Sequence, residues 1–97
     1  MIRFEWDDGN IAHLAKHDVT PSEAEEVIHN EPFDIELQNE KDEERTLQVG
    51  ETNTGRILMV VSTLRKRKIR VVTAFDAPKA MKAIYLKEKA KTYGTGS

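Results

Sequence analysis

Two apolar runs near the middle of the chain predict the centre of a β-sheet. Residues 57–64 and 69–75 are rich in β-branched and large apolar side chains, and each run has the length of an ordinary strand. The basic segment between them favours a β-hairpin, although no Asn-Gly or Asp-Gly marks the turn. Because apolar side chains occupy both odd and even positions, we expect strands that are covered on both faces by the rest of the chain.

Three further segments alternate between apolar and polar residues, as half-buried strands do. The first is a short strand at residues 2–6, the second is residues 33–38, and the third is residues 46–50 with Leu47 and Val49 turned inward. Residues 39–44 are charged and lack a period, so they predict a loop between the second and third strands.

Two helices are expected between the first two strands. An aspartate at position 7 or 8 caps the first helix, which ends near His17 and has an apolar stripe of Ile11, Leu14 and Ala15. The second helix begins with a capping box, in which Thr20 is the N-cap and Glu23 follows three residues later. It ends before Pro32 and buries Ala24, Val27 and Ile28.

A last helix follows Asp76, and its apolar residues are expected to line one side: Ala80, Met81, Ile84, Tyr85 and Leu86. The resulting order, β-α-α-β-β-β-β-α, predicts an α+β fold. It has an N-terminal strand, two helices, an antiparallel sheet of about four strands and a C-terminal helix. We expect residues 1–91 to form one domain and residues 92–97 to form a disordered tail.

Composition excludes several classes of protein. The chain has no cysteine, so disulfides, thiolate metal sites and a cysteine nucleophile are excluded. No apolar run approaches the length of about 18 residues that crosses a bilayer, and acidic residues stand where a signal peptide needs an apolar run. We therefore expect a soluble, cytoplasmic protein with no membrane partner.

Charge is divided unevenly along the chain. Residues 1–52 contain 15 acidic and 4 basic residues, whereas residues 53–97 contain 2 acidic and 11 basic residues. Such a division indicates an anionic partner for the second half, with nucleic acid as the first candidate. The alternatives are that the two halves neutralise each other across the fold, or that the charges are solvated.

The two histidines of the first helix do not predict a metal site. His13 and His17 are one helical turn apart, but no acidic residue lies between them and no third ligand is evident. The sequence therefore predicts neither a metal nor another cofactor.

The chain does contain the groups that RNA cleavage without a metal would need. Such a reaction requires a base, an acid and cations that stabilise the charge on phosphorus. Proton transfer could come from His17, Glu51 or Tyr85, and positive charge from Lys16, Arg45, Arg56, Lys68 and Arg70. The alternative for each arginine is a solvated or cross-strand-paired side chain. Phe75, at the end of a strand, could stack on a base, but an aromatic residue there more often packs in the core.

A resemblance to a known family narrows these alternatives. The pattern that carries it consists of Phe4-Glu5-Trp6-Asp7, Leu14, Lys16-His17, Val19-Thr20, Glu23-Ala24, Glu44-Arg45, Gly50, Gly55-Arg56, Ile69-Arg70-Val71-Val72 and Tyr85. In this pattern the chain resembles the BrnT family of toxins over almost its whole length to residue 88. The N-terminal part of the pattern is the more specific.

The resemblance implies a RelE-like fold and a toxin of a type II toxin–antitoxin system, which cleaves RNA without a metal and inhibits translation. It implies a BrnA-like antitoxin with a ribbon-helix-helix domain, through which alone the complex would bind operator DNA. A homo-oligomer and a 2:2 complex are both open. Expected catalytic residues are His17, Arg45, Arg56, Arg70 and Tyr85; expected RNA-binding residues are Lys16, Arg65, Lys66, Arg67 and Lys68.

The chain departs from the family pattern at five positions. Asn10, His13 and Asp18 stand where the family commonly has lysine, asparagine and glycine. Phe75 and Met81 stand where it has an arginine at a strand end and a glutamate in the last helix. These last two departures favour the alternative function, a catalytically weak or inactive relative that binds RNA or a partner protein.

Overall fold

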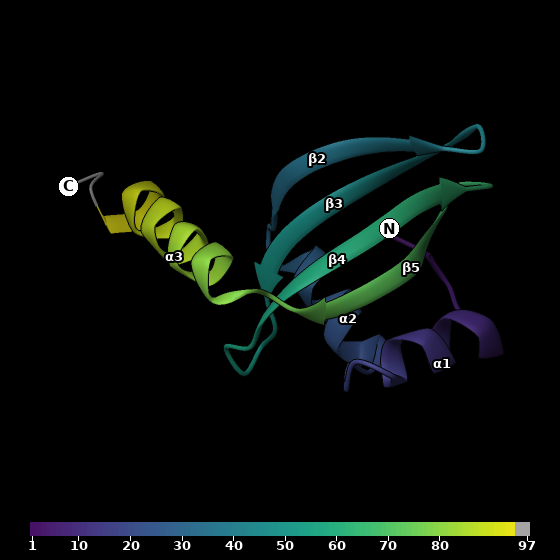
Figure 1. The fold of residues 1–97 in the computed structure, drawn as a ribbon, viewed down its shortest axis with the longest axis horizontal. Coiled ribbons are helices and arrows are strands. Elements are labelled where there is room, and N and C mark those ends of the chain that lie inside the picture. Colours follow the sequence, from purple (N-terminus) through teal and green to yellow (C-terminus); the bar gives the residue numbers. More distant parts are fainter. Residues whose placement is uncertain (95–97) are drawn as a thin grey trace.

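The computed structural model describes residues 1–94, with residues 92–94 described by their backbone alone. They form a five-stranded sheet and three helices (Figure 1). In chain order the elements are β1 (Phe4–Glu5), α1 (Asp8–Ala15), α2 (Pro21–His29), β2 (Phe33–Glu40), β3 (Glu43–Glu51), β4 (Ile57–Arg65), β5 (Lys68–Asp76) and α3 (Lys79–Gly94). The expected α+β class and element order are confirmed.

The sheet has the strand order β1-β5-β4-β3-β2. Strands β2 to β5 form the expected antiparallel meander. Strand β1 pairs in parallel with β5, with Phe4 opposite Ile69, and so adds a fifth strand. Parallel strands need a crossover connection, which α1, α2 and the meander provide. β4 is central and largely buried on both faces, as its continuous apolar sequence predicts.

Both long hairpins close with two-residue turns made of charged residues. Lys66 and Arg67 join β4 to β5 with φ of 51° and 66°, and Lys41 and Asp42 join β2 to β3 with φ of 51° and 64°. The loop predicted over residues 39–44 is therefore wrong, because its outer residues belong to the strands. Turns with positive φ at both positions match the twist of the strands, and here they form without glycine or asparagine.

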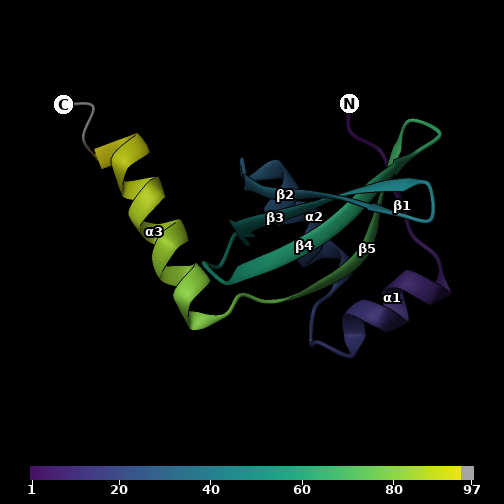
Figure 2. The ribbon, with the colours of Figure 1, turned by 45° about the horizontal axis from the view of Figure 1, so that its top comes forward.

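Helices α1 and α2 cover one face of the sheet, here called the helix face (Figures 1 and 2). Its core contains Leu14, Val19, Ala24, Val27, Leu58, Val60, Val71 and Ala74. The predicted apolar stripe of α1 is only partly correct, since Ile11 and Ala15 are exposed. Asn10 is buried instead, and its side-chain amide donates to the backbone carbonyls of Glu5 and Val71.

The opposite face, here called the open face, is covered only at one end. There α3 leaves β5 and places Tyr85 in a second cluster with Val49, Ile57, Met59 and Ala77. Beyond this contact α3 extends away from the sheet (Figure 2). For that reason Ile84 and Leu86, which were expected to be buried, are each 53% exposed.

Strand β2 forms an edge of the sheet and contains a β-bulge between Asp34 and Glu36. The bulge interrupts the alternation of side chains. Phe33 packs against the apolar cluster, but Ile35 and Leu37 are exposed, so the half-buried alternation expected over residues 33–38 is only partly correct.

The C-terminal helix continues through Gly94, whereas the sequence predicts a disordered tail from residue 92. Residues 95–97 of that predicted tail lie outside the described residues. Among the helices that the structure describes, none is long and apolar enough to span a bilayer.

Candidate functional site

An arginine row crosses the open face near the hairpin tips. Arg45 in β3 pairs with Thr63 in β4, which pairs with Arg70 in β5. Arg65 lies two residues after Thr63, and side chains two residues apart in a strand point to the same face. Strand register thus brings together three arginines that are up to 25 residues apart in the sequence.

These arginines line a pocket of about 220 Å³, here called the arginine pocket. Helix α1 forms one wall and the strands form the floor, because α1 packs along β5 (Figure 1). The lining residues are Gly9, Asn10, His13, Glu43, Arg45, Arg65, Arg70 and Val72.

Glu43 holds two of the arginines in the pocket. Its carboxylate accepts a hydrogen bond from Arg45 Nε at 3.0 Å and a longer one from Arg65 Nη2 at 3.5 Å. Arg45 Nη1 also donates to Glu40 at 3.3 Å. The hydrogen bond from Arg45, followed by that from Arg65, lowers the pKa of Glu43 below its ordinary value. Glu43 therefore stays a carboxylate and orients the guanidinium groups.

Arg70 is held by the residue that caps α1. Its Nη1 and Nη2 donate to the two carboxylate oxygens of Asp7 at 2.7 and 3.2 Å. Asp7 is the N-cap, and its Oδ1 also accepts from the backbone N–H of Asn10. The Arg70 guanidinium, followed by this backbone N–H, lowers the pKa of Asp7 to about 2, and Asp7 raises the pKa of Arg70. This ion pair fixes the start of α1 against β5.

The aromatic rings of three residues follow one another from α1 to β5: His13, His17 and Phe75. The first of them, His13, lines the pocket. The His13 and His17 rings are stacked with centroids 6.2 Å apart, and the His17 ring lies 6.0 Å from that of Phe75. His17, the expected catalytic histidine, is thus one helical turn beyond the pocket, and His13 is the imidazole that lines it. The sequence analysis considered His13 only as half of a metal pair, because its position beside the arginines depends on how α1 packs on β5.

Arg56 lies away from the arginine pocket and ties four segments together. Its Nη1 donates to the carbonyl oxygen of Asp18 at 2.6 Å and to Glu23 at 3.2 Å, and its Nε lies 3.6 Å from Asp76. The pKa values of Glu23 and Asp76 are lowered, chiefly by hydrogen bonds from the Thr20 backbone and from Lys82, with Arg56 contributing to both. These contacts give the expected catalytic residue Arg56 a structural role in joining α2 to the ends of β4 and β5.

Tyr85 lies at the other end of the open face. It is 1% exposed, its ring centroid is 5.3 Å from that of Phe33, and its hydroxyl contacts Glu51 Oε1 at 3.2 Å. Glu51 also forms an ion pair with Lys89. The structure therefore places Tyr85 in the apolar cluster and does not bring it to the arginine pocket.

The remaining cations expected to bind RNA surround the arginine pocket at a distance. Lys66, Arg67 and Lys68 are exposed at the tip of the β4–β5 hairpin, one to three residues beyond Arg65. Lys16 is exposed at the C-terminal end of α1. Long exposed cations of this kind suit a polyanion that extends beyond the pocket.

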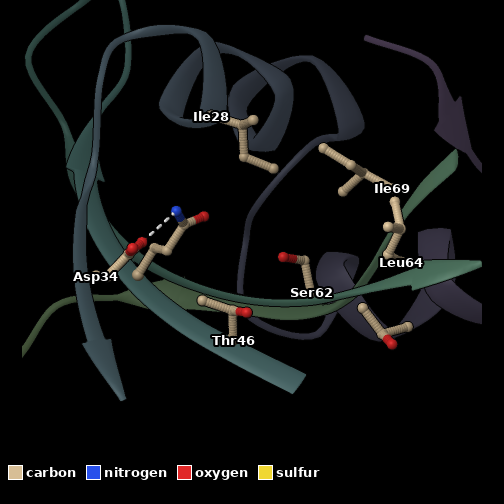
Figure 3. A pocket seen from close by; sticks show the side chains of 8 residues that line it. Ile28, Asp34, Thr46, Ser62, Leu64 and Ile69 are labelled. Atoms are coloured by element: carbon tan, nitrogen blue, oxygen red, sulfur yellow. Dashed lines mark hydrogen bonds between the residues drawn. The ribbon is translucent and has the colours of Figure 1, made fainter. Parts of the chain in front are cut away.

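A second pocket, of about 300 Å³, lies on the helix face (Figure 3). Ile28, Leu64 and Ile69 supply apolar walls, while Asp34 accepts a hydrogen bond from Gln48 at 2.7 Å. None of its lining residues is a lysine or arginine. Within residues 1–94, no three histidine, aspartate or glutamate side chains are grouped so that they could hold a metal ion.

The fold and the arginine pocket together describe a small α+β protein with three arginines gathered on the open face of its sheet. Comparison with known families shows which one this is. The ribonuclease toxins called BrnT, of type II toxin–antitoxin systems, match residues 6–80, and the chain belongs to this family. No curated protein matches the chain. Membership implies an RNA substrate and an antitoxin partner.

Proposed function

We propose that this protein is a ribonuclease toxin that cleaves RNA at the arginine pocket without a metal ion and thereby inhibits translation. It acts in the cytoplasm and is held inactive by a BrnA-like ribbon-helix-helix antitoxin. Operator DNA is bound only through that antitoxin. The toxin itself forms a homo-oligomer, or it forms a 2:2 complex with the antitoxin.

The convergence of Arg45, Arg65 and Arg70 in one pocket carries this proposal. A guanidinium has five N–H donors in a planar fork that matches the oxygens of a phosphate. The carboxylates of Glu43 and Asp7 use some of these donors and hold the planes in place. Donors that are fixed before substrate binds need little rearrangement as charge develops on the phosphate oxygens.

RNA would enter from the hairpin tips, where Lys66, Arg67 and Lys68 are exposed. Their positive charges would contact neighbouring phosphates of the strand, so binding should weaken as salt concentration rises. At the other side of the pocket, the rings of His17 and Phe75 offer surfaces on which a base can stack.

A second candidate function is RNA or partner-protein binding without cleavage. Phe75 and Met81 stand where the family pattern has an arginine and a glutamate, and both pack against the apolar cluster around Tyr85. These two positions therefore contribute no charge to the open face. This observation favours a weaker nuclease than other members, or one that binds without cutting.

Induced expression and purified protein test the two candidates together. Expression from a tightly controlled promoter should arrest growth and produce new RNA ends. The purified protein should cut RNA in excess EDTA and leave 2′,3′-cyclic phosphate and 5′-hydroxyl ends. RNA binding with intact RNA would contradict the nuclease and leave the binding function.

A matched pair of variants locates the site. Arg45→Gln with Arg65→Gln should reduce cleavage by at least about 100-fold, because it removes donors that stabilise the transition state. Lys79→Gln with Lys87→Gln makes the same change in net charge at exposed positions of α3 and should leave cleavage within about twofold. Equal losses in the two variants would show that general charge, and not the pocket, determines activity.

A further inference from the structure

We propose that His13 is the general base of this toxin and removes the proton from the ribose 2′-hydroxyl beside the bond that is cut. The inference rests on the proposed ribonuclease activity and concerns a residue at which this chain departs from the family pattern. The expected catalytic histidine, His17, then serves the neighbouring part of the substrate.

The composition of the arginine pocket leads to this assignment. Arginine side chains stay protonated in proteins, so Arg45, Arg65 and Arg70 cannot accept a proton. Glu43 is bound by two of them and its lowered pKa makes it a weak base. Among the residues that line the pocket, His13 has the one imidazole, the side chain that most often serves as a general base.

The position of His13 on α1 is fixed by contacts of the residues that precede and follow it. Three residues before it, Asn10 is buried and donates to the backbone of β1 and β5 at 3.0 and 3.1 Å. One residue after it, Leu14 is fully buried in the core of the helix face. The imidazole is therefore carried on a helix that cannot shift along β5 without breaking these contacts, which is the rigidity that a catalytic group needs.

The chemical step can be written with its protons in place. Neutral His13 accepts the 2′-hydroxyl proton while the 2′-oxygen forms a bond to phosphorus and the bond from phosphorus to the 5′-oxygen breaks. The departing 5′-oxygen takes a proton from water, and the resulting hydroxide removes the proton from the imidazolium. Arg45, Arg65 and Arg70 stabilise the negative charge on the non-bridging oxygens, and the products are a 2′,3′-cyclic phosphate and a 5′-hydroxyl.

Three variants separate proton transfer from stacking and from packing. His13→Asn restores the residue that is common in the family, His13→Phe keeps a stacking ring, and His29→Asn changes an exposed imidazole on α2 that does not line the arginine pocket. Cleavage of one RNA oligonucleotide in EDTA gives kcat and KM, and thermal unfolding checks the fold. Both His13 variants should lower kcat by at least about 100-fold with little change in KM, whereas His29→Asn should keep kcat within about twofold.

The pH dependence of kcat is a readout that would not change if His13 had only a structural role. The charged groups facing His13 are His17 on α1, Glu43 and Arg45 on β3, Arg65 on β4 and Arg70 on β5. The rise of kcat with pH through the histidine range should disappear in His13→Asn and remain in His29→Asn.

The outcomes distinguish this inference from the function on which it rests. Wild-type protein that binds but does not cut RNA would overturn both. Cutting by the wild type with unchanged kcat and pH profile in His13→Asn would overturn only the role of His13. Retained kcat in His13→Phe, with a raised KM in His13→Asn, would assign the ring to stacking instead. As a check without RNA, inorganic phosphate should shift the NMR signals of the His13 ring and lose this effect in Arg45→Gln with Arg65→Gln.

Discussion

The two ends of the open face have the same backbone and opposite chemistry. At the hairpin tips, Arg45, Arg65 and Arg70 point from the strands into a charged pocket with α1 at its side. At the far end, Val49, Met59 and Tyr85 occupy the same face and form a closed apolar cluster. The difference arises from coverage, because α3 packs against the apolar end, whereas α1 lies only at the side of the charged end (Figures 1 and 2).

This comparison shows how a chain of 97 residues can combine stability with an exposed cationic site. Burial of apolar side chains stabilises the covered end, while the charges at the open end remain hydrated and add little to stability. We therefore expect substitutions at the covered end to lower the free energy of unfolding and those in the arginine pocket to lower activity.

Removing the largest side chain at the covered end should have the greatest effect. Tyr85→Ala leaves a cavity under α3 and should lower the free energy of unfolding by about 3–5 kcal/mol, as measured by urea denaturation. Tyr85→Phe removes only the hydroxyl that contacts Glu51 and should cost about 1 kcal/mol.

Leu86→Ala is the control for this prediction, because Leu86 is exposed on the same helix. It should change the free energy of unfolding by less than about 0.5 kcal/mol. A similar loss in Tyr85→Ala and Leu86→Ala would contradict the view that Tyr85 anchors α3.

Asn10 tests the boundary between the two kinds of region, since it lines the arginine pocket yet is buried. Asn10→Ala leaves the carbonyl groups of Glu5 and Val71 without their donor and should destabilise the protein by about 1–3 kcal/mol. Urea denaturation should show no such loss for Asn39→Ala, an exposed asparagine in β2. Equal stability of the two variants would mean that α1 is held by its other contacts.

The two hairpin turns allow stability and binding to be changed in opposite directions. Arg67→Gly relieves a positive φ and should raise the free energy of unfolding by about 0.5–1 kcal/mol. It also removes a cation, so the dependence of RNA affinity on salt should fall by about one phosphate contact.

Asp42→Gly relieves the same strain in the other turn and removes an acid instead of a cation. Its stability should rise by a similar amount, and filter binding should show no loss of RNA affinity. A loss of affinity in both variants would indicate that turn conformation, rather than charge at the β4–β5 tip, governs RNA binding.

The smallest effect is expected from the ion pair that fixes α1. The pKa of Asp7 is about 2 in the folded protein and 3.8 in its unperturbed state, so the unfolded state binds more protons between these values. The stability that Asp7 contributes is therefore present above about pH 4 and is lost as the pH falls toward 2.

Unfolding of wild type and Asp7→Asn in urea, measured from pH 6 to pH 2, checks this sign. The difference between the free energies of unfolding of the two proteins should be constant above about pH 4.5 and should shrink below it. The Asp7 side chain is 54% exposed, so solvent screening keeps the difference small. A difference that grows on acidification would contradict the assignment to Asp7.

The sequence predicted the parts of the fold that local physics determines. The Thr20 capping box, the continuous apolar run of β4 and the inward side chains of Leu47 and Val49 in β3 each depend on neighbouring residues, and each is confirmed. The turn at Lys41 and Asp42 could not be predicted, because lysine rarely adopts positive φ and the turn contains no glycine or asparagine. Likewise, the β-bulge at Asp34 displaces Ile35 without any glycine to signal it.

The sequence also named Arg45, Arg65 and Arg70, but it could not show that they share a pocket. Their convergence depends on strand register, which is a property of the whole sheet. No signal in the sequence separates Arg56 from these three arginines, since a structural and a catalytic arginine look alike in sequence. The position of His13 in the pocket was also missed, because its neighbours there come from strands that follow it by 30 to 60 residues.

The parallel pairing of β1 with β5 determines when this protein can become active during its synthesis. Asp7 and its partner Arg70 are separated by 63 positions, and β1 has no other strand with which to pair. At translation rates of about 5–20 residues per second, β5 is made roughly 3–13 s after β1. The arginine pocket therefore cannot close before β5 has been made, so the site does not exist while the ribosome is still making the segment from β1 to β5.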